Sequence, residues 1–293
     1  MTFDFFSFRF EFSAIGSIIF PRGETGNILR GALGHALRKV SCDSLCPGAA
    51  LCPNRDSCAY ARIFEPSSNR RGPSGLRNRP RPVVLRARHL EGTSFETHER
   101  FWFEVNLFET RKPAHDQFVH AFEQLAADGF GPQRGRAELV STEKRPMSVS
   151  LNPSTGRVNL LRVEFLTPTE LKSGAHLVSQ PDFPVLLARA RDRISTLRGL
   201  YGAGPLSIDF RAISERVALV KISHCELRQV EATRRSSRTG QVHGIGGFVG
   251  VVEYSGELSE FMPYLEAARF TGVGRQCGWG KGEFRLEILA RQS

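Results

Sequence analysis

Residues 6–12 of this 293-residue chain read Phe-Ser-Phe-Arg-Phe-Glu-Phe, an alternation of aromatic and polar side chains. A period of two is typical of a β-strand with one buried face, because successive side chains of a strand point to opposite sides. A helix is expected next, over residues 27–40, where apolar side chains recur every three or four positions and Asn27 stands as the N-cap. The chain therefore opens with a strand and a helix that can cover it.

The same periodicities continue along the chain. The first half then predicts strands within residues 83–90 and 101–109, a helix over 115–128 and a strand over 136–142. The second half predicts a strand over residues 158–166, a helix over 184–200, extended segments over 217–230 and 245–255, a helix over 258–268 and a strand over 284–288. Each half has the order strand-helix-strand-strand-helix-strand, which is the ferredoxin-like order. We therefore predict an α+β protein with one ferredoxin-like domain over residues 1–150 and another over 151–293.

The charge balance points to an acidic partner. The chain has 40 Lys and Arg against 30 Asp and Glu, which gives a net charge of +10, and only six of the 40 are Lys. Guanidinium groups bind phosphates in a bidentate manner and stack on bases, so nucleic acid is the leading partner class. A GC-rich genome would also produce many arginines.

Membrane insertion and export are not expected. The chain has no run of 18 apolar residues, and Asp4, Arg9 and Glu11 interrupt the apolar N-terminal segment. We therefore expect a cytoplasmic protein without membrane contacts.

A glycine-rich segment stands between the last predicted helix and the last strand. Residues 271–282 read Thr-Gly-Val-Gly-Arg-Gln-Cys-Gly-Trp-Gly-Lys-Gly. Glycines let backbone N–H groups approach phosphates, cations add charge and an indole offers a stacking face. The predicted ligand contacts are Gly272, Gly274, Arg275, Trp279, Gly280 and Lys281. A mobile glycine-rich turn without ligands explains the spacing equally well.

Two further segments are basic. Residues 69–88 contain seven arginines and no acidic residue, and a second arginine group precedes the glycine-dense residues 244–250. Such unbalanced charge favours a polyanion, although a solvated loop is the simpler alternative. The candidate nucleic-acid contacts in and beside these two segments are Arg70, Arg71, Arg77, Arg79, Arg81, Arg234, Arg235, Arg238 and His243.

His35 is the candidate for acid–base chemistry. It lies on the predicted helix 27–40, outside the apolar stripe, and Arg38 and Lys39 follow at the i+3 and i+4 positions. An imidazole can act as a general base near neutral pH, and adjacent cations can stabilise an anionic transition state. An exposed helical histidine without a role is the alternative.

Four cysteines fall within an insertion over residues 41–82. Cys42, Cys46, Cys52 and Cys58 could close a tetrahedral zinc site or hold an iron–sulfur cluster, although the usual C-x2-C pair is missing. A structural metal would order a segment that is poor in apolar residues, whereas free thiols are the alternative. No acidic cluster suited to two-metal phosphoryl chemistry is present, so a nuclease activity would be metal-independent.

Taken together, these segments resemble the RAMP superfamily of CRISPR-associated proteins, and within it the Cas-six family of repeat-RNA processing endoribonucleases. The resemblance is carried by residues 29–38, by the cysteine cluster ending in Ile63-Phe64-Glu65-Pro66, by residues 246–250 and by residues 271–282. It covers nearly the whole chain, and the order and spacing of the motifs are more specific than any one of them.

The resemblance implies tandem ferredoxin-like (RRM-like) domains and cleavage of precursor CRISPR RNA within the repeat, without a metal cofactor. The 2′-hydroxyl would attack the adjacent phosphate, leaving 2′,3′-cyclic phosphate and 5′-hydroxyl ends. His35 matches the position of a catalytic histidine on the first helix, Arg38 and Lys39 would stabilise charge, and Arg22 and Arg30 are reserve candidates. The implied partners are the repeat RNA stem-loop, retained after cleavage, and other CRISPR effector subunits. The alternatives are a non-catalytic RNA-binding subunit of an effector complex and, less favoured, a zinc-stapled interaction module.

Overall fold

The computed structural model describes residues 1–42, 45–66, 79–153, 156–231, 233–235, 242–244 and 246–292. The chain forms two compact units. The N-terminal unit contains Asp4–Met147 and Tyr201–Ala203, and the C-terminal unit contains Met1–Phe3, Ser148–Leu200 and Gly204–Ser293.

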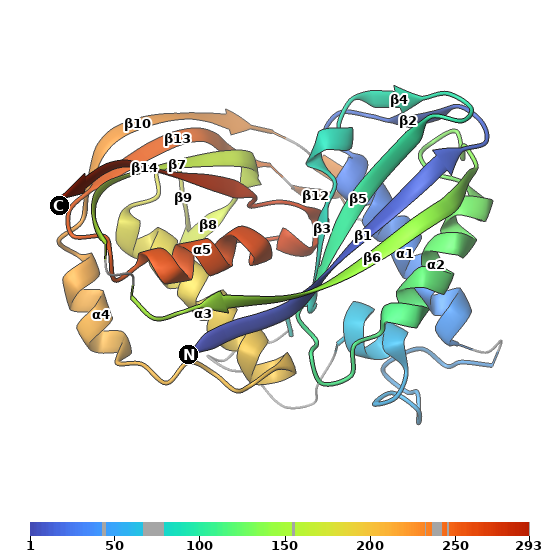
Figure 1. Cartoon of the computed structure of the whole chain (residues 1–293), viewed down its shortest axis with the longest axis horizontal. Coiled ribbons are helices and arrows are strands. Elements are labelled where there is room, and N and C mark those ends of the chain that lie inside the picture. Colours follow the sequence, from blue (N-terminus) through green and yellow to red (C-terminus); the bar gives the residue numbers. More distant parts are fainter. Residues whose placement is uncertain are drawn as a thin grey trace. The chain divides into compact units, whose positions relative to one another are not determined.

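The N-terminal unit is built on a four-stranded sheet with the strand order β3-β5-β1-β6 (Figure 1). Its elements are β1 (Thr2–Ala14), β2 (Ile18–Phe20), α1 (Thr25–Ser41), the π-helical turn η1 (Tyr60–Phe64), β3 (Val83–Arg86), the 3-10 turn η3 (Arg88–Leu90), β4 (Thr93–Phe95), β5 (Arg100–Leu107), α2 (His115–Asp128) and β6 (Ala137–Ser150). The four strands of the βαββαβ motif are, in chain order, β1, β3, β5 and β6. The first and third of them, β1 and β5, therefore lie at the centre of the sheet. This is the ferredoxin-like arrangement.

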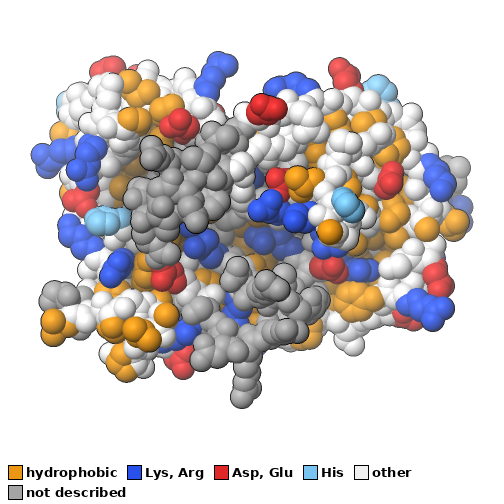
Figure 2. Space-filling view, turned by 180° about the vertical axis from the view of Figure 1, so that it is seen from behind, with side chains coloured by type: hydrophobic (Ala, Val, Ile, Leu, Met, Phe, Trp, Pro, Cys, Tyr) orange, Lys and Arg blue, Asp and Glu red, His pale blue; other side chains and the backbone are white. Residues whose placement is uncertain are grey.

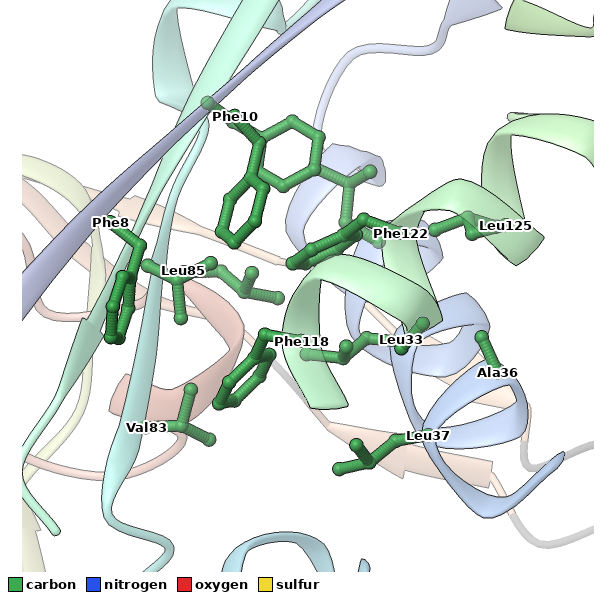
Figure 3. Packing of buried hydrophobic residues seen from close by; sticks show 14 of the residues in the cluster. Phe8, Phe10, Leu33, Ala36, Leu37, Val83, Leu85, Phe118, Phe122 and Leu125 are labelled. Atoms are coloured by element: carbon green, nitrogen blue, oxygen red, sulfur yellow. The ribbon is translucent and has the colours of Figure 1, made fainter. Parts of the chain in front are cut away.

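The core of this unit is aromatic. Phe8, Phe10 and Phe12 are fully buried, and Phe10 and Phe12 stand opposite Phe103 and Phe101 of β5. Figure 3 shows side chains of β1, β3, α1 and α2 pointing into one common core. The period of two therefore sends one face of β1 against both helices, as the sequence predicts.

The C-terminal unit repeats the same plan with the sheet order β10-β13-β7-β14 (Figure 1). Its elements are β7 (Arg157–Thr169), β8 (Leu171–Ser173), β9 (His176–Val178), α3 (Phe183–Tyr201), α4 (Phe210–Val217), β10 (Lys221–Val230), β11 (Thr233–Arg235), β12 (Val242–Gly244), β13 (Gly247–Ser255), α5 (Met262–Thr271), the 3-10 turn η4 (Cys277–Trp279) and β14 (Phe284–Gln292). The predicted α+β class with two ferredoxin-like domains is confirmed.

Two local predictions are wrong. Helix α1 begins at Thr25 with Glu24 as its N-cap, so Asn27 lies inside the first turn. Residue 217 ends helix α4 and does not begin a strand. Helix α4 forms because Asp209 caps its N-terminus: the Asp209 carboxylate accepts hydrogen bonds from the backbone N–H groups of Arg211 at 3.0 Å and Ala212 at 2.9 Å.

The cysteine-containing insertion contributes more to the core than its composition predicts. In its described parts, Ala59, Ala61 and Ile63 are buried members of the N-terminal core, and Phe64 is 9% exposed. The insertion is thus attached to the unit by apolar packing, to which the partly buried Cys42 and Cys58 also contribute.

In the part of the chain that the structure describes, no helix is long and apolar enough to cross a membrane.

Candidate functional site

Helix α1 and the turn before it carry the residues predicted to perform chemistry. Leu29, Leu33 and Leu37 are buried and fix one side of the helix to the core. Because successive helical residues are about 100° apart, the other side of α1 faces outward. That outward side carries the predicted catalytic residues His35, Arg38 and Lys39, and the half-buried Arg30 lies at its edge.

The His35 side chain is exposed on this outward side. Gly31 lies one turn earlier, and a Cβ atom placed there would meet no other atom within 4 Å. Arg38 is also exposed and lies three residues later, within reach of the same side. His35 thus has open space at Gly31 and an exposed arginine one turn later on the same side of the helix, residue types that suit proton transfer next to an anionic group.

The other predicted cations differ in their surroundings. The Lys39 ammonium lies 3.6 Å from the carboxylate of Asp128 on α2, which balances part of its charge. Arg22 is exposed in the turn before α1, and its aliphatic part packs against Gly92. Arg38 is therefore the better placed of the two cations that follow His35, because Lys39 already has an acidic partner.

The four cysteines of the insertion are free thiols and partly buried. Burial raises the pKa of the Cys42 thiol to about 12, and hydrogen bonds with the thiols of Cys46 and Cys58 contribute to this rise in pKa. The structure thus brings three of the four sulfurs together. Within the described ranges, however, no group of three or more His, Cys, Asp or Glu side chains has an arrangement that could hold a metal ion.

The basic loop is described only at its C-terminal end. Arg70, Arg71 and Arg77 lie outside the described residues. Arg79 and Arg81 are half-buried, and the Arg81 side chain donates a hydrogen bond from Nε to the backbone carbonyl of Phe64. Arg81 is therefore held against the cysteine-containing insertion.

The glycine-rich segment 271–282 forms a compact loop in the C-terminal unit. The backbone N–H groups of Val273, Arg275 and Gly282 donate to the carbonyls of Gly282, Glu170 and Pro168 at 2.9, 3.0 and 3.3 Å. These amides are consequently engaged within the unit and are not available to a phosphate. Ligand contacts have to come from its side chains and remaining amides.

Glycine is required at specific positions of this loop. Gly274 and Gly282 have φ angles of 88° and 69°, a region that favours glycine. A Cβ atom at Gly274 would lie 2.4 Å from the carbonyl oxygen of Glu170, and one at Gly282 would lie 1.9 Å from that of Val273. Part of the glycine content is therefore explained by packing.

The predicted ligand side chains of the loop differ in exposure. Arg275 is exposed and forms an ion pair with Glu170, whereas Trp279 is half-buried and Lys281 is 9% exposed. Gly272 is buried and Gly280 is half-buried. Arg275 and Trp279 are the members of this set with the most surface to offer a ligand.

A hairpin and a cavity lie next to this loop. In the hairpin, Arg234 of β11 stands opposite His243 of β12, and Arg238 falls outside the described residues. The Gln276 side chain donates a hydrogen bond to the carbonyl of Gly244 at 3.2 Å, which ties the loop to the hairpin. A cavity of about 410 Å³ is lined by the carboxylate residues Glu170 and Glu231 and by the apolar residues Leu177 and Phe248, among others.

Basic side chains are not confined to these two regions. Figure 2 shows Lys and Arg side chains at many points of one face of the molecule, with Asp and Glu between them. On that face the basic side chains are thus scattered among acidic ones and do not form one continuous patch.

Two family models match the chain. One, AF_1859_N, is described as an N-terminal domain and matches residues 3–160. The other is described as CRISPR-associated endoribonuclease Cas6 and matches residues 163–284. Residues 163–284 of the chain therefore form a Cas6-type domain. The matching family is described as CRISPR-associated endoribonucleases, and this match supports CRISPR RNA processing as the broad function of the chain.

Relatives of known structure share the Cas6 fold. A Cas6 product complex, of a Cas6 protein from Thermus thermophilus, has a TM-score of 0.58 and 16% identity and covers 97% of this chain and 99% of that chain. A partial Cas6-RT-Cas1–Cas2 complex has a TM-score of 0.60 and 10% identity, covering 99% of this chain and 47% of that chain. An uncharacterised protein of Archaeoglobus fulgidus is 24% identical over 284 residues, which span 89% of this chain and 91% of that protein.

One contact in the N-terminal unit of this chain was missed by sequence reasoning. Phe64 of η1 packs against Gly34 of α1, immediately before His35 in the sequence. The segment Ile63-Phe64-Glu65-Pro66 signals an apolar anchor after the cysteines, but only the structure shows which helix it reaches.

Proposed function

We propose that this protein is a metal-independent endoribonuclease that cleaves precursor CRISPR RNA within the repeat. The cut would leave a 2′,3′-cyclic phosphate on one product and a 5′-hydroxyl on the other. The observation that carries this proposal is the outward side of α1, where His35 is exposed, Gly31 leaves open space one turn earlier and exposed Arg38 follows at i+3. The Cas6 family supplies the substrate class.

In this proposal His35 acts as the general base. Its imidazole takes the proton of the 2′-hydroxyl upstream of the cut, and that oxygen then attacks the adjacent phosphorus. The bond from phosphorus to the 5′-oxygen breaks, and the leaving oxygen takes a proton from solvent or from the imidazolium. Arg38 stabilises the additional negative charge on the phosphorane-like transition state, with a smaller contribution from Lys39 because of its ion pair with Asp128.

RNA binding would use the basic residues of both units. In the N-terminal unit we propose Arg79 and Arg81, together with Arg70, Arg71 and Arg77. In the C-terminal unit we propose the hairpin residues Arg234, Arg235, Arg238 and His243 and the loop residues Gly274, Arg275, Trp279 and Lys281. The N–H groups of Gly272 and Gly280 donate to the carbonyls of Ala268 and Cys277, so these two glycines would only shape the loop. A stem-loop would be recognised by its A-form shape and its phosphates, with bases stacking beside the stem. Many phosphate contacts favour retention of the product.

Other CRISPR proteins are proposed as partners. The support is the similar chain that forms part of a Cas6-RT-Cas1–Cas2 complex. Our chain matches 47% of that larger chain, so association through a separate subunit is the arrangement proposed here.

Cleavage of a repeat RNA in EDTA tests the proposed function. We expect one cut in the repeat, a cyclic phosphate on the upstream product, and no cut when the nucleotide before the cut carries a 2′-deoxy sugar, because the nucleophile is then missing. Binding of the deoxy substrate should be preserved. Cleavage that depends on added Mg²⁺ would contradict the proposed chemistry, whereas binding without any cut would indicate a non-catalytic RNA-binding subunit.

We also propose that Cys42, Cys46, Cys52 and Cys58 hold a structural zinc ion or iron–sulfur cluster that has no part in cleavage. The support is the contact of the Cys42 thiol with those of Cys46 and Cys58. Thiolates are the preferred ligands of both metals. In the structure no three of the four cysteines are arranged to hold a metal ion, so binding would have to draw their sulfurs closer together. Binding would displace protons from the thiols, so metal affinity should rise with pH.

Metal analysis of the purified protein tests this second proposal. We expect about one zinc ion, or about one cluster with its visible absorption, per chain. Cys58→Ser should lower both the metal content and the thermal midpoint of unfolding, whereas the matched change Cys225→Ser, outside the cluster, should leave the metal content unchanged. A protein free of zinc and iron after purification without chelators, and unchanged in stability on zinc addition, would contradict the proposal.

A further inference from the structure

The aromatic ring of Phe64 occupies a notch that glycine leaves in α1. A Cβ atom at Gly34 would lie 2.2 Å from the tip of that ring, so no residue other than glycine fits there without moving it. Tyr60 stacks on Phe64 with ring centroids 5.7 Å apart and 20° between the planes, and its hydroxyl donates to the carboxylate of Glu65 at 2.9 Å. The ring is therefore held at its tip by the helix at Gly34 and on its face by Tyr60.

Two guanidinium groups rest on this one ring. The Cζ atom of Arg30, from α1, lies 5.1 Å from the ring centroid of Phe64. The Cζ atom of Arg81, which precedes β3, lies 5.0 Å from the same centroid. A cation within about 6 Å of an aromatic ring is attracted by the negative charge of the ring face. Phe64 thus gathers two cations from segments far apart in the sequence.

We propose that Phe64 is a positioning residue that assembles Arg30 and Arg81 into a phosphate-binding pair. The ligand is a phosphodiester of the RNA strand, so this inference rests on the proposed function. Two guanidiniums that meet at one ring concentrate positive charge there, and a phosphate beside them would be attracted by both. Both arginines are half-buried and so keep part of their surface accessible.

The position of this pair along α1 relates it to the proposed cut. Arg30 precedes His35 by five residues, which corresponds to about 7.5 Å along the helix axis. The same five residues turn the helix by about 140°, so a strand with its scissile phosphate at His35 would reach Arg30 by running from the outward side of α1 toward its edge. The pair would fix the register of the strand, while His35 performs the proton transfer.

The salt dependence of RNA binding tests this inference. Phe64→Leu keeps an apolar side chain but removes the ring face, so we expect repeat-RNA affinity to fall about tenfold and the slope of log Kd against log salt to shrink by about one. Arg81→Gln should shrink the slope similarly, and the double variant should add little to either single one.

A matched variant separates positioning from a general loss of packing. Phe95→Leu removes another partly buried ring of the same unit, which packs on Phe20 and Phe101, and should leave the salt slope unchanged. An unchanged slope in Phe64→Leu, or strictly additive effects of Phe64→Leu and Arg81→Gln, would overturn the inference. Failure of the wild-type protein to bind repeat RNA at all would instead overturn the proposed function.

Discussion

Replacing His35 with alanine should reduce the single-turnover rate constant of repeat-RNA cleavage by about 10²–10⁴-fold, which is the contribution of a positioned acid–base group. The Kd for the RNA should stay within about threefold of the wild-type value, because His35 contributes one side chain to a surface with many phosphate contacts. The side chain is exposed on α1, so its removal should hardly change the unfolding midpoint. Single-turnover cleavage and filter binding measure the two quantities.

The matched control is His120→Ala. His120 is also an exposed histidine of a helix in the N-terminal unit, but it lies on α2 and not on α1. We expect wild-type cleavage from this variant. If His35→Ala also cleaves at the wild-type rate, the general base lies elsewhere, and Arg22, Arg30 and Arg38 become the residues to replace next.

The fold was predictable because its determinants are local. The alternation in residues 6–12 places Phe8, Phe10 and Phe12 on one face without any knowledge of what covers them, and the structure buries all three. The order of strands and helices follows from such periods, and the ferredoxin-like order then fixes which strands are neighbours. Element ends depend on caps, which is why Asp209 created a helix that periodicity did not predict.

The candidate site was predictable only in its residue types. Exposure of His35 follows from helical periodicity, since it lies outside the apolar stripe of α1. The ion pair of Lys39 with Asp128 and the seating of Phe64 against Gly34 join residues from separate elements. No local sequence pattern encodes such contacts, because they depend on how the elements pack. The ion pair of Lys39 in turn decides how much of its charge remains available for RNA.

A substitution in the glycine-rich loop should have the second large effect, on the free energy of unfolding. Gly282→Ala should lower the free energy of unfolding by roughly 2–4 kcal/mol, since a left-handed backbone conformation alone costs an alanine about 1–2 kcal/mol. The added Cβ would also lie 1.9 Å from the carbonyl oxygen of Val273, whose N–H donates to Gly282 at 2.9 Å. The loop therefore has to shift, and RNA affinity should fall with it. Denaturant unfolding and RNA binding measure both effects.

Gly174→Ala separates the two causes of that loss. Gly174 has a φ angle of 59°, in the same left-handed region, but a Cβ atom there would meet nothing within 4 Å. It should therefore cost only the conformational part, about 1–2 kcal/mol, and leave RNA binding intact. If Gly282→Ala and Gly174→Ala lower the free energy of unfolding by the same amount, the glycine-rich loop is not held against Val273. Its glycines would then serve mobility or ligand contact, and Arg275 and Trp279 would act from a loop that orders only when RNA binds.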